Sequence, residues 1–364
     1  MSYKIFHFVS SLNVGGAERF ALDLSVIQKQ MGHEVVVLSA GDEDDLLVEE
    51  AEKIEIPTKI IHSGRIHFYS QLIFLLKERS SKKEKILHIH SPSILLYIAP
   101  ILLILKYYRV KIIYTRHGCD PLARFKWYLS HRWGRYFVSL TTFVSQAGLD
   151  VFHKNHHWPK SSLRMIKNGV LVPENVSVLN KGAGQEIKKL RLGSVGRLVP
   201  LKSQQHLLEA VSKLAFDKQG QIEVHIYGDG PDRVMLENFA NQSIVYAEVY
   251  FHGMVLDRER IFSSIDMLVM CSETEGLSMS IMEAMARKKP VIATDVGDSG
   301  KLVLPEMTGK LYDYGDIEKL SNLIDHYVTN IKDREEQGRR AQEHIKDNYS
   351  ILETAKLYDQ CYKL

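Results

Sequence analysis

The sequence predicts an α/β protein of two domains, each a parallel sheet covered by helices. A chain of 364 residues is too long for one ordinary core and suits two domains of roughly 150 to 200 residues. Short apolar runs alternate with helix-sized segments in both halves, which is typical of parallel sheets covered on both faces. Between the halves, residues 173–189 lose the apolar period and become polar, as an interdomain linker does.

The first half opens with a β-α-β pattern. Its residues predict a strand at 3–9, a glycine-containing loop at 10–16, a helix at 17–31 and a strand at 34–38. Further strands are expected at residues 86–90, 111–115, 140–144 and 163–166, which makes this half Rossmann-like. The longest apolar run, residues 94–105, contains Pro100 and has 12 residues, fewer than the roughly 20 that span a bilayer. We expect it to form a buried helix.

The second half repeats the architecture without repeating the sequence. Strands are expected at residues 192–195, 223–227, 249–251, 267–270 and 291–293, followed by a polar helical stretch over 317–348 and a last helix. We place the boundary near residue 183. The expected domains are therefore residues 1–183 and residues 184–348, with the C-terminal helix at 349–364.

Cysteine use and the N-terminus indicate a cytoplasmic protein. The three cysteines, Cys119, Cys271 and Cys361, have no CxxC spacing, so neither a disulfide framework nor a zinc site is indicated. The first residues have an apolar run but no basic region and no small-residue cleavage site, so we expect a first strand and no signal peptide.

Two carboxylates mark the segment after the strand at 267–270. Glu275 precedes a predicted helix and Glu283 lies within it, eight positions and roughly 12 Å further along. Backbone N–H groups at a helix N-terminus attract anions, so a diphosphate is expected between the two acids, near Gly276, Leu277 and Ser278. The alternative is that Glu275 only favours the dipole of its helix and Glu283 is a solvated helical residue.

Further candidates follow other predicted strands. Gly196 opens a loop that carries Arg197 and Lys202, two cations able to compensate the charge of a diphosphate or simply to face solvent. Gly15 and Gly16 form a turn before the first helix, which alone indicates only tight geometry. His117 ends a strand, at the edge where open α/β sheets bind ligands; His88 and His90 end another, His90 being the stronger candidate.

The string EGLSMSIMEAMA followed by KPVIATDVG resembles the Glu-x7-Glu signature of retaining glycosyltransferases of family 4, which have the GT-B fold. SVGRLVPLKS, NVGGAER and the GDGP turn at 228–231 resemble further motifs of that family, as do His117-Gly and Asn168-Gly169. The chain departs from the family pattern at four positions near the second acid: Lys288, Lys289, Asp298 and Lys301. These departures concern loop shape more than chemistry.

The resemblance implies two domains that face each other across a cleft, with the C-terminal helix crossing back to the first. It implies that Glu275 binds hydroxyls of the donor sugar and Glu283 the ribose of a nucleoside-diphosphate sugar. Arg197 and Lys202 would stabilise the leaving diphosphate, His117 would lie near the donor, and the Gly15-Gly16-x-Glu18 loop would approach the phosphates or the acceptor. No Asp-x-Asp motif appears near a strand end, so neither a metal nor another cofactor is expected.

The implied reaction is retaining transfer of a sugar to an acceptor hydroxyl, in the biosynthesis of polysaccharide, lipopolysaccharide or glycolipid. Two other classes stay open. A nucleotide-sugar epimerase or hydrolase would share the donor site but release isomerised or free sugar without an acceptor. A catalytically idle subunit would bind nucleotide and transfer nothing.

Charge is divided unevenly between the halves and suggests where the acceptor binds. Residues 1–183 carry 24 Lys and Arg against 16 Asp and Glu, a net +8, whereas the remainder carries 23 against 28, a net −5. Residues 106–137 hold eight cations, one acid and interleaved aromatic residues, which suits an anionic membrane surface or, alternatively, an ordinary helix with its aromatics in the core. We expect a glycan or lipid-linked acceptor, peripheral binding to the inner face of the membrane, and no nucleic-acid partner.

Overall fold

The computed structural model describes residues 2–61, 65–77, 83–118, 121–122, 124–174 and 189–363. The chain forms two compact units. The first comprises residues 1–169 together with 351–364, and the second comprises residues 170–350. Both are parallel α/β units, as the sequence predicts. No helix within the described ranges is both long enough and apolar enough to cross a membrane.

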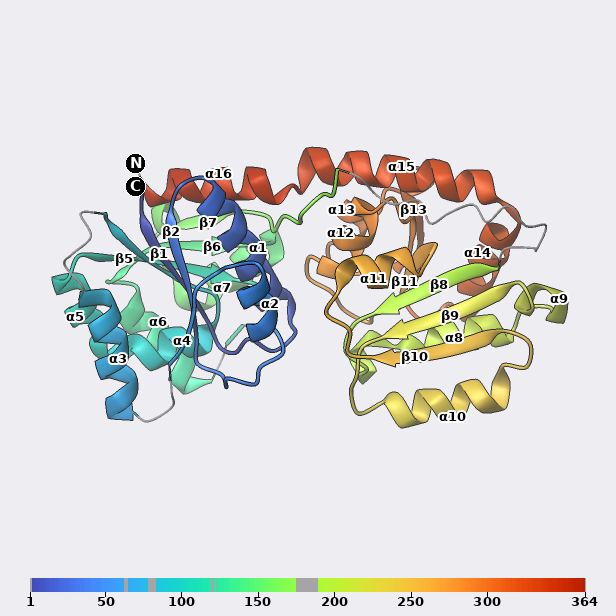
Figure 1. Cartoon of the computed structure of the whole chain (residues 1–364), viewed down its shortest axis with the longest axis horizontal. Coiled ribbons are helices and arrows are strands. Elements are labelled where there is room, and N and C mark those ends of the chain that lie inside the picture. Colours follow the sequence, from blue (N-terminus) through green and yellow to red (C-terminus); the bar gives the residue numbers. More distant parts are fainter. Residues whose placement is uncertain are drawn as a thin grey trace. The chain divides into compact units, whose positions relative to one another are not determined.

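The first unit contains one seven-stranded parallel sheet in the order β3-β2-β1-β4-β5-β6-β7 (Figure 1). Its elements are β1 (Lys4–Val9), α1 (Gly16–Gln30), β2 (Glu34–Ser39), α2 (Val48–Lys53), β3 (Thr58–Ile60), α3 (Arg65–Lys77), β4 (Lys85–Ile89), α4 (Pro92–Ile98), η1 (Ala99–Ile101), α5 (Leu102–Tyr107), β5 (Val110–Arg116), α6 (Phe125–Gly134), β6 (Val138–Phe143), α7 (Gln146–His156), η2 (Lys160–Ser162), β7 (Leu163–Met165) and α16 (Ile351–Tyr362).

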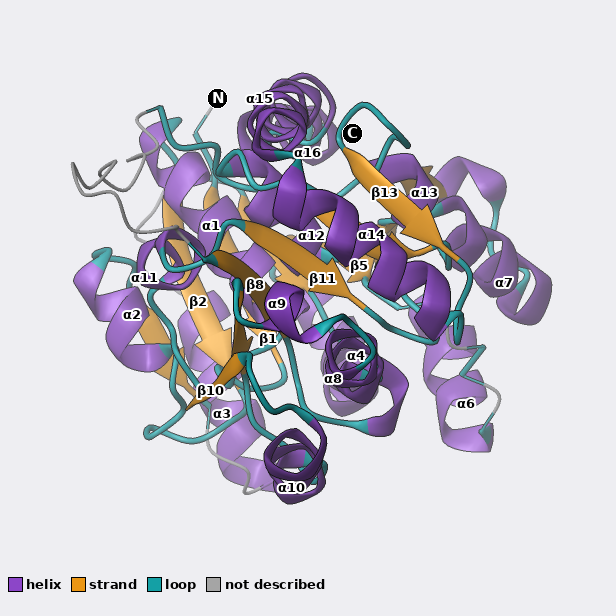
Figure 2. Ribbon diagram, turned by 90° about the vertical axis from the view of Figure 1, so that its right-hand side faces the viewer, coloured by secondary structure: helices purple, strands orange, loops and turns teal. Residues whose placement is uncertain are grey.

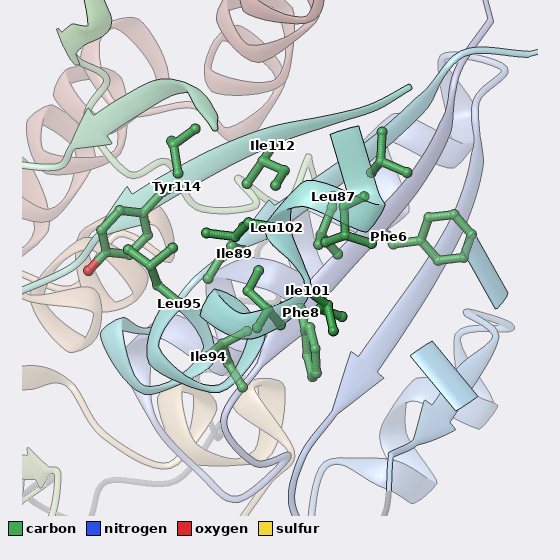
Figure 3. Close-up of a cluster of buried hydrophobic side chains, with 14 of the residues drawn as sticks. Phe6, Phe8, Leu87, Ile89, Ile94, Leu95, Ile101, Leu102, Ile112 and Tyr114 are labelled. Carbon is green, nitrogen blue, oxygen red and sulfur yellow. The ribbon is translucent and has the colours of Figure 1, made fainter. Parts of the chain in front are cut away.

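The two faces of this sheet carry different kinds of side chain, because successive residues of a strand point to opposite faces. Phe6, Leu87 and Ile112 point to a face where they pack with helices α4 and α5 in a core of aliphatic and aromatic side chains (Figure 3). The residues next to them, such as His7 and His88, point to the opposite face, which α1 and α16 cover. The second face is therefore a polar interior, and its hydrogen bonds decide how its side chains are oriented.

The second unit contains a six-stranded parallel sheet in the order β10-β9-β8-β11-β12-β13. Its elements are β8 (Leu190–Val195), η3 (Pro200–Lys202), α8 (Gln204–Ser212), α9 (Phe216–Gln219), β9 (Ile222–Tyr227), α10 (Arg233–Ser243), β10 (Glu248–Gly253), α11 (Arg258–Ser263), β11 (Met267–Met270), α12 (Met279–Ala286), β12 (Val291–Thr294), α13 (Ser299–Leu302), β13 (Gly309–Tyr312), α14 (Ile317–Thr329) and α15 (Ile331–Asn348). Figure 2 shows α12 on one side of β8 and β11 and α8 on the other, in agreement with the two apolar clusters of this unit.

The structure corrects several element predictions. Strands β3 and β13 were not predicted; both are short and only partly buried, so their residues do not form an apolar run. The run at 94–105 is not one helix but divides into α4, η1 and α5. The division lies at Pro100, because proline has no backbone N–H to continue the helical hydrogen bonds. The polar stretch at 317–348 is two helices, α14 and α15, joined at Asn330.

The boundary between the units lies at 169/170 and not near residue 183, which falls outside the described residues together with most of the predicted linker. The reason is local. The Val170 amide donates to the Tyr349 carbonyl at 2.9 Å, and Val170 forms a parallel bridge with Ser350, so the chain joins the second unit at once. The last helix, α16, begins at Ile351 and belongs to the first unit.

Candidate functional site

The candidate donor residues gather at the carboxyl edge of the second unit's sheet. Strands β8 and β11 are neighbours, and the sheet grows from them in opposite directions, through β9 and β10 on one side and β12 and β13 on the other. Ligands of open α/β sheets bind at such a switch point, outside the carboxyl ends of the strands. Gly196 and Arg197 follow β8, and Glu275 follows β11.

Glycines in the GDGP turn hold the backbone around Arg197. Gly228 and Gly230 have φ values of +134° and +157°. A Cβ atom on them would lie 1.9 Å from the Gly196 carbonyl oxygen and 2.2 Å from that of Leu198. Only glycine therefore lets the β9 loop approach the β8 loop. The side chain of Arg197 is exposed and makes no hydrogen bond or ion pair within the described part of the chain.

Lys202 and Glu275 form an ion pair between the β8 and β11 loops. The pair is largely shielded, because the Glu275 side chain is 9% exposed and that of Lys202 is 24% exposed. The Ser272 hydroxyl also donates to Glu275, at 2.7 Å, and both bonds go to Oε1. The other carboxylate oxygen, Oε2, has no partner among the described residues. This arrangement fixes the carboxylate and leaves one oxygen able to accept a hydrogen bond.

The loop that carries Glu275 is also held from the β12 side. Gly297 has φ +56°, and a Cβ on it would lie 1.8 Å from the Glu275 carbonyl oxygen. Any side chain at this position would displace one of the two loops. The prediction that Glu275 lies at the helix N-terminus is wrong, because α12 starts at Met279 with Ser278 as its N-cap. The backbone of Gly276 and Leu277 forms the approach to that helix.

Helix α12 has a start without a side-chain cap and a buried acid further along. The Ser278 side chain makes no capping hydrogen bond, so the first-turn N–H groups are not satisfied from that residue. Glu283 is 8% exposed, and its Oε1 lies 3.3 Å from Nη1 of Arg258 on α11. The alternative that Glu283 is solvated is therefore wrong. The two predicted cations, Arg197 and Lys202, and the two predicted acids therefore lie near the same edge of one sheet.

Sequence reasoning missed two residues that fix these acids, Arg258 and Ser272. Arg258 is one of several charged residues in LDRER, and nothing in that string distinguishes the one that pairs with Glu283. Ser272 lies three residues before Glu275 in a short loop, where serine side chains commonly form local hydrogen bonds. The second contact could have been anticipated from spacing, and the first could not.

In the first unit the switch point lies between β1 and β4. Gly15 is the N-cap of α1 and Gly16 its first residue, after the loop that follows β1. The Glu18 carboxylate folds back over Gly15, where a Cβ would lie 2.3 Å from its Oε2. A carboxylate so near a helix N-terminus is stabilised by the dipole and accepts hydroxyl groups more readily than phosphates. The GGxE loop therefore lies at the carboxyl edge of the sheet and carries an acid over the start of α1.

His117 lies directly after β5 and belongs to a buried cluster of histidines. Its Nε2 is 3.2 Å from Nδ1 of His90, and its ring packs edge-on against Phe20 of α1 at 5.4 Å between centroids. Burial, together with the neighbouring charge of Arg116, lowers the pKa of His117 to about 3, so the ring is neutral near pH 7. His88 lies deeper, between Thr115 and Tyr362.

Comparison with known families matches both units. The model described as Glycosyltransferase Family 4 matches residues 14–172, and the model described as Glycosyl transferases group 1 matches residues 179–344. The solved structure of the Anabaena protein HepE in complex with UDP and glucose has a TM-score of 0.82 at 19% identity, covering 99% of both chains. This likeness establishes a GT-B type fold.

Two curated relatives differ in how much of them the chain covers. N-acetyl-alpha-D-glucosaminyl L-malate synthase of Bacillus anthracis is 21% identical over 96% of this chain and 94% of its own length. Poly(ribitol-phosphate) alpha-N-acetylglucosaminyltransferase of Staphylococcus aureus is 26% identical over 51% of this chain and 37% of its own length. The chain thus spans little more than a third of that enzyme. With both units matched and the fold in agreement, the chain belongs to the family 4 type of glycosyltransferases.

Proposed function

We propose that the protein transfers a sugar from a nucleoside-diphosphate sugar to an acceptor hydroxyl, with retention at the anomeric carbon. One observation carries the proposal. Lys202 and Ser272 hold Glu275 through Oε1 and leave Oε2 open, at the carboxyl edge of the sheet and just before the start of α12. The site therefore offers a carboxylate that can accept hydrogen bonds from sugar hydroxyls, together with a cation and a helix N-terminus that can bind phosphate. A sugar diphosphate requires both kinds of group.

The donor diphosphate would bind to cations and backbone N–H groups without a metal ion. A Lys ammonium has three donors, so Lys202 can keep its bond to Glu275 and donate to a phosphate oxygen at the same time. Arg197, exposed and unpaired within the described ranges, would supply a second, bidentate donor. Gly276, Leu277 and Ser278 lead the chain into the N-terminus of α12, whose dipole favours the anion.

Sugar and nucleoside would bind at opposite ends of this anion site. Glu275 would accept hydroxyl groups of the sugar through Oε2, and Glu283 would accept those of the ribose while Arg258 holds its carboxylate in place. The complex of HepE with UDP and glucose supports UDP-sugars as the first donors to test, and the names of both curated relatives support an N-acetylglucosaminyl group among the sugars tried.

We favour same-face attack as the chemical step. The bond between the anomeric carbon and the β-phosphate oxygen breaks, the acceptor oxygen bonds to that carbon from the same side, and its proton passes to the departing phosphate. Negative charge grows on the leaving oxygen, where Arg197 and Lys202 would stabilise it more strongly than in the ground state. Glu275 is held by a cation and a hydroxyl, which suits binding rather than nucleophilic attack.

A basic aromatic face on the first unit supports a membrane-associated acceptor. The exposed members of this face are Lys106, Tyr107, Arg109, Arg124, Phe125, Lys126, Tyr128, Arg132, Trp133 and Tyr136. Tyr107 and Phe125 are 75% and 73% exposed, so these aromatics do not belong to the core. Arg116, one of the eight cations counted in residues 106–137, is buried and is not part of this face.

Aromatic and cationic side chains together favour the interface of an anionic bilayer. A cavity of about 360 Å³ adds to this surface, with Lys106, Arg109 and Lys111 in its lining. Within the proposed function, the face would bring the protein to a lipid-linked or surface glycan at the inner side of the membrane.

Purified protein incubated with UDP-, GDP- and ADP-sugars tests the proposal. A ligand at 100 times its Kd raises the free energy of unfolding by about 2.7 kcal/mol, so one nucleotide series should raise the Tm clearly above the others. Transfer to an acceptor should persist in EDTA. Release of free or isomerised sugar without acceptor would establish the hydrolase or epimerase alternative, and nucleotide binding without turnover on any acceptor would establish the idle subunit.

A further inference from the structure

A chain of hydrogen bonds joins His117 to Gln28 in the last turn of helix α1. His117 Nε2 lies 3.2 Å from Nδ1 of His90, whose Nε2 lies 2.9 Å from Nδ1 of His7. The Nε2 atom of His7 lies 2.7 Å from Oε1 of Gln28, and Nε2 of Gln28 donates to the Tyr362 hydroxyl at 2.9 Å. His7, His90 and Gln28 are almost completely buried, so this part of the chain is shielded from solvent, whereas His117 at its end is partly exposed.

Each imidazole in the chain carries one proton at neutral pH. Burial lowers the pKa of His7 to about 4 and, with help from Arg116, that of His117 to about 3. Burial and the neighbouring rings hold the pKa of His90 well below its usual value. A neutral imidazole has one N–H donor and one acceptor nitrogen, so a bond made by one nitrogen determines the role of the other.

Gln28 sets the direction of the whole chain. Its amide nitrogen is engaged with Tyr362, so its oxygen faces His7 and can only accept. His7 therefore has its proton on Nε2 and accepts at Nδ1 from His90. His90 in turn accepts at Nδ1 from His117. The proton of His117 is consequently on Nε2, and its Nδ1 carries a lone pair.

The other side of Gln28 is compatible with this direction. The Tyr362 hydroxyl accepts from Gln28 and can donate to Nδ1 of His88 at 3.0 Å, and Nε2 of His88 can donate to Thr115 at 2.7 Å. Turning the Gln28 amide over would reverse every one of these bonds and move the His117 proton to Nδ1. The network thus has two self-consistent proton arrangements, and one buried amide selects between them.

The same rings could be taken for a metal site, because nitrogens of His7, His88 and His90 lie within 4.8 Å of one another. Both nitrogens of every one of these rings are already within hydrogen-bond distance of a partner. A metal ion would have to break that chain. The geometry favours an oriented proton network over a metal centre.

We propose that Gln28 is a positioning residue that holds His117 in the tautomer protonated at Nε2, so that Nδ1 acts as a hydrogen-bond acceptor. This Nδ1 is buried and is without a partner in the described part of the chain. Its use rests on the proposed function: at the carboxyl end of β5, a donor-sugar or acceptor hydroxyl would donate to it. Helix α16 contributes through Tyr362, whose hydroxyl accepts from the Gln28 amide nitrogen.

Imidazole ¹⁵N NMR on the full chain labelled at histidine tests the tautomer directly, because protonated and unprotonated ring nitrogens have well separated shifts. Loss of signals in His117→Ala assigns the residue. We expect wild-type His117 to show a protonated Nε2 and an unprotonated Nδ1. Gln28→Leu should leave both tautomers populated, with the preference reduced roughly tenfold, which corresponds to one ordinary hydrogen bond.

Thr142→Val is the matched control. Thr142 is buried in the same polar interior and bonds Thr115 and Tyr358, but it is outside the line from Gln28 to His117. In Thr142→Val, the ¹⁵N shifts of His117 should equal those of wild type. A wild-type His117 with its proton on Nδ1, or an equal mixture, overturns the proposal whatever the Gln28 variant does. Absence of transferase activity with a correct tautomer would overturn the proposed function and leave Gln28's role standing.

Discussion

At the scale of single residues, the two acids are expected to act on different ends of the donor. Glu283→Ala should weaken binding of the nucleoside diphosphate itself, whereas Glu275→Ala should mainly weaken binding or turnover of the sugar donor. Each change removes a hydrogen-bonded, shielded carboxylate and should cost roughly 1.5 to 3 kcal/mol. Calorimetric titration with diphosphate and with donor separates the two effects.

Glu273→Ala is the control for these acids, because Glu273 is exposed in the same loop, two residues from Glu275. It should bind both ligands like wild type. If the Glu275 and Glu283 variants also bound both ligands like wild type, the assignment of the two acids would be wrong.

The two cations are expected to matter more for turnover than for affinity. Charge grows on the leaving diphosphate as the glycosidic bond breaks, so Arg197→Ala and Lys202→Ala should lower kcat more than they raise the donor KM. Lys202→Ala also leaves Glu275 with Ser272 alone, so it should be the more damaging change. Lys213→Ala, an exposed cation after α8, should leave kcat unchanged. Wild-type kcat in both site variants would contradict this role.

At the scale of loops and elements, Gly297 should be irreplaceable for the position of Glu275. Gly297→Ala would place a Cβ 1.8 Å from a backbone oxygen at φ +56°, and relief of that clash must move the loop. We expect a loss of stability of about 1 to 3 kcal/mol and a weaker donor affinity. Gly220→Ala is the control, since its nearest atom would lie at 3.7 Å. Equal Tm values for the two variants would exclude the packing argument.

In the second unit, the positions of the completely buried strands are predicted well from the sequence. The strand at 267–270 lies where its four apolar residues place it, and the neighbouring strands follow within two residues. Short edge strands such as β13 escape prediction, because half of the Gly309–Tyr312 strand is only partly buried. The N-terminus of α12 lies further along the chain than Glu275, where the sequence predicted it, since Gly276 and Leu277 extend the loop to Ser278.

The site was predictable as a set of motifs and not as a set of contacts. Glu275 and Lys202 were each identified from their strings, yet nothing in the sequence shows that they pair across 73 positions. The partner of Glu283 on α11 and the role of Gln28 depend on which faces the helices turn to the sheets. Those orientations follow from packing of the whole unit, which local patterns do not encode.

At the scale of the whole molecule, the buried histidines should make stability depend on pH. Their folded-state pKa values are lowered, to about 4 for His7 and about 3 for His117, so below pH 6.5 the unfolded chain binds more protons than the folded chain. Their contribution to stability is therefore complete above about pH 6.5 and is lost as pH falls toward those values. Each ring contributes up to about 1.4 kcal/mol per pH unit.

Tryptophan fluorescence can follow this effect in the first unit alone. The three tryptophans, Trp127, Trp133 and Trp158, all belong to that unit, and Trp158 is fully buried. We expect the urea midpoint to fall clearly between pH 7.5 and pH 5.5. An unchanged midpoint would show that the histidines are not held neutral.

The basic aromatic face should bind anionic vesicles in a salt-sensitive way. Co-sedimentation should rise with anionic lipid and fall as salt screens the cations, because the Debye length shortens to about 8 Å at 0.15 M. Phe125→Ser should weaken binding. Phe216→Ser, which removes an aromatic side chain that is 65% exposed in the second unit, should leave it unchanged. No sedimentation with either neutral or anionic vesicles at low salt would point to a soluble acceptor.

The central claim is retaining transfer from a nucleoside-diphosphate sugar, and the anomeric configuration of the product tests it most directly. Donors labelled with ¹³C at the anomeric carbon, beginning with UDP-sugars, would be incubated with the protein and with glycan or lipid-linked acceptors in EDTA. The one-bond carbon–hydrogen coupling then gives the configuration by NMR. We expect a new glycoside with the configuration of the donor, and no such product with Glu275→Ala. An inverted product, or free sugar as the sole product, would contradict it.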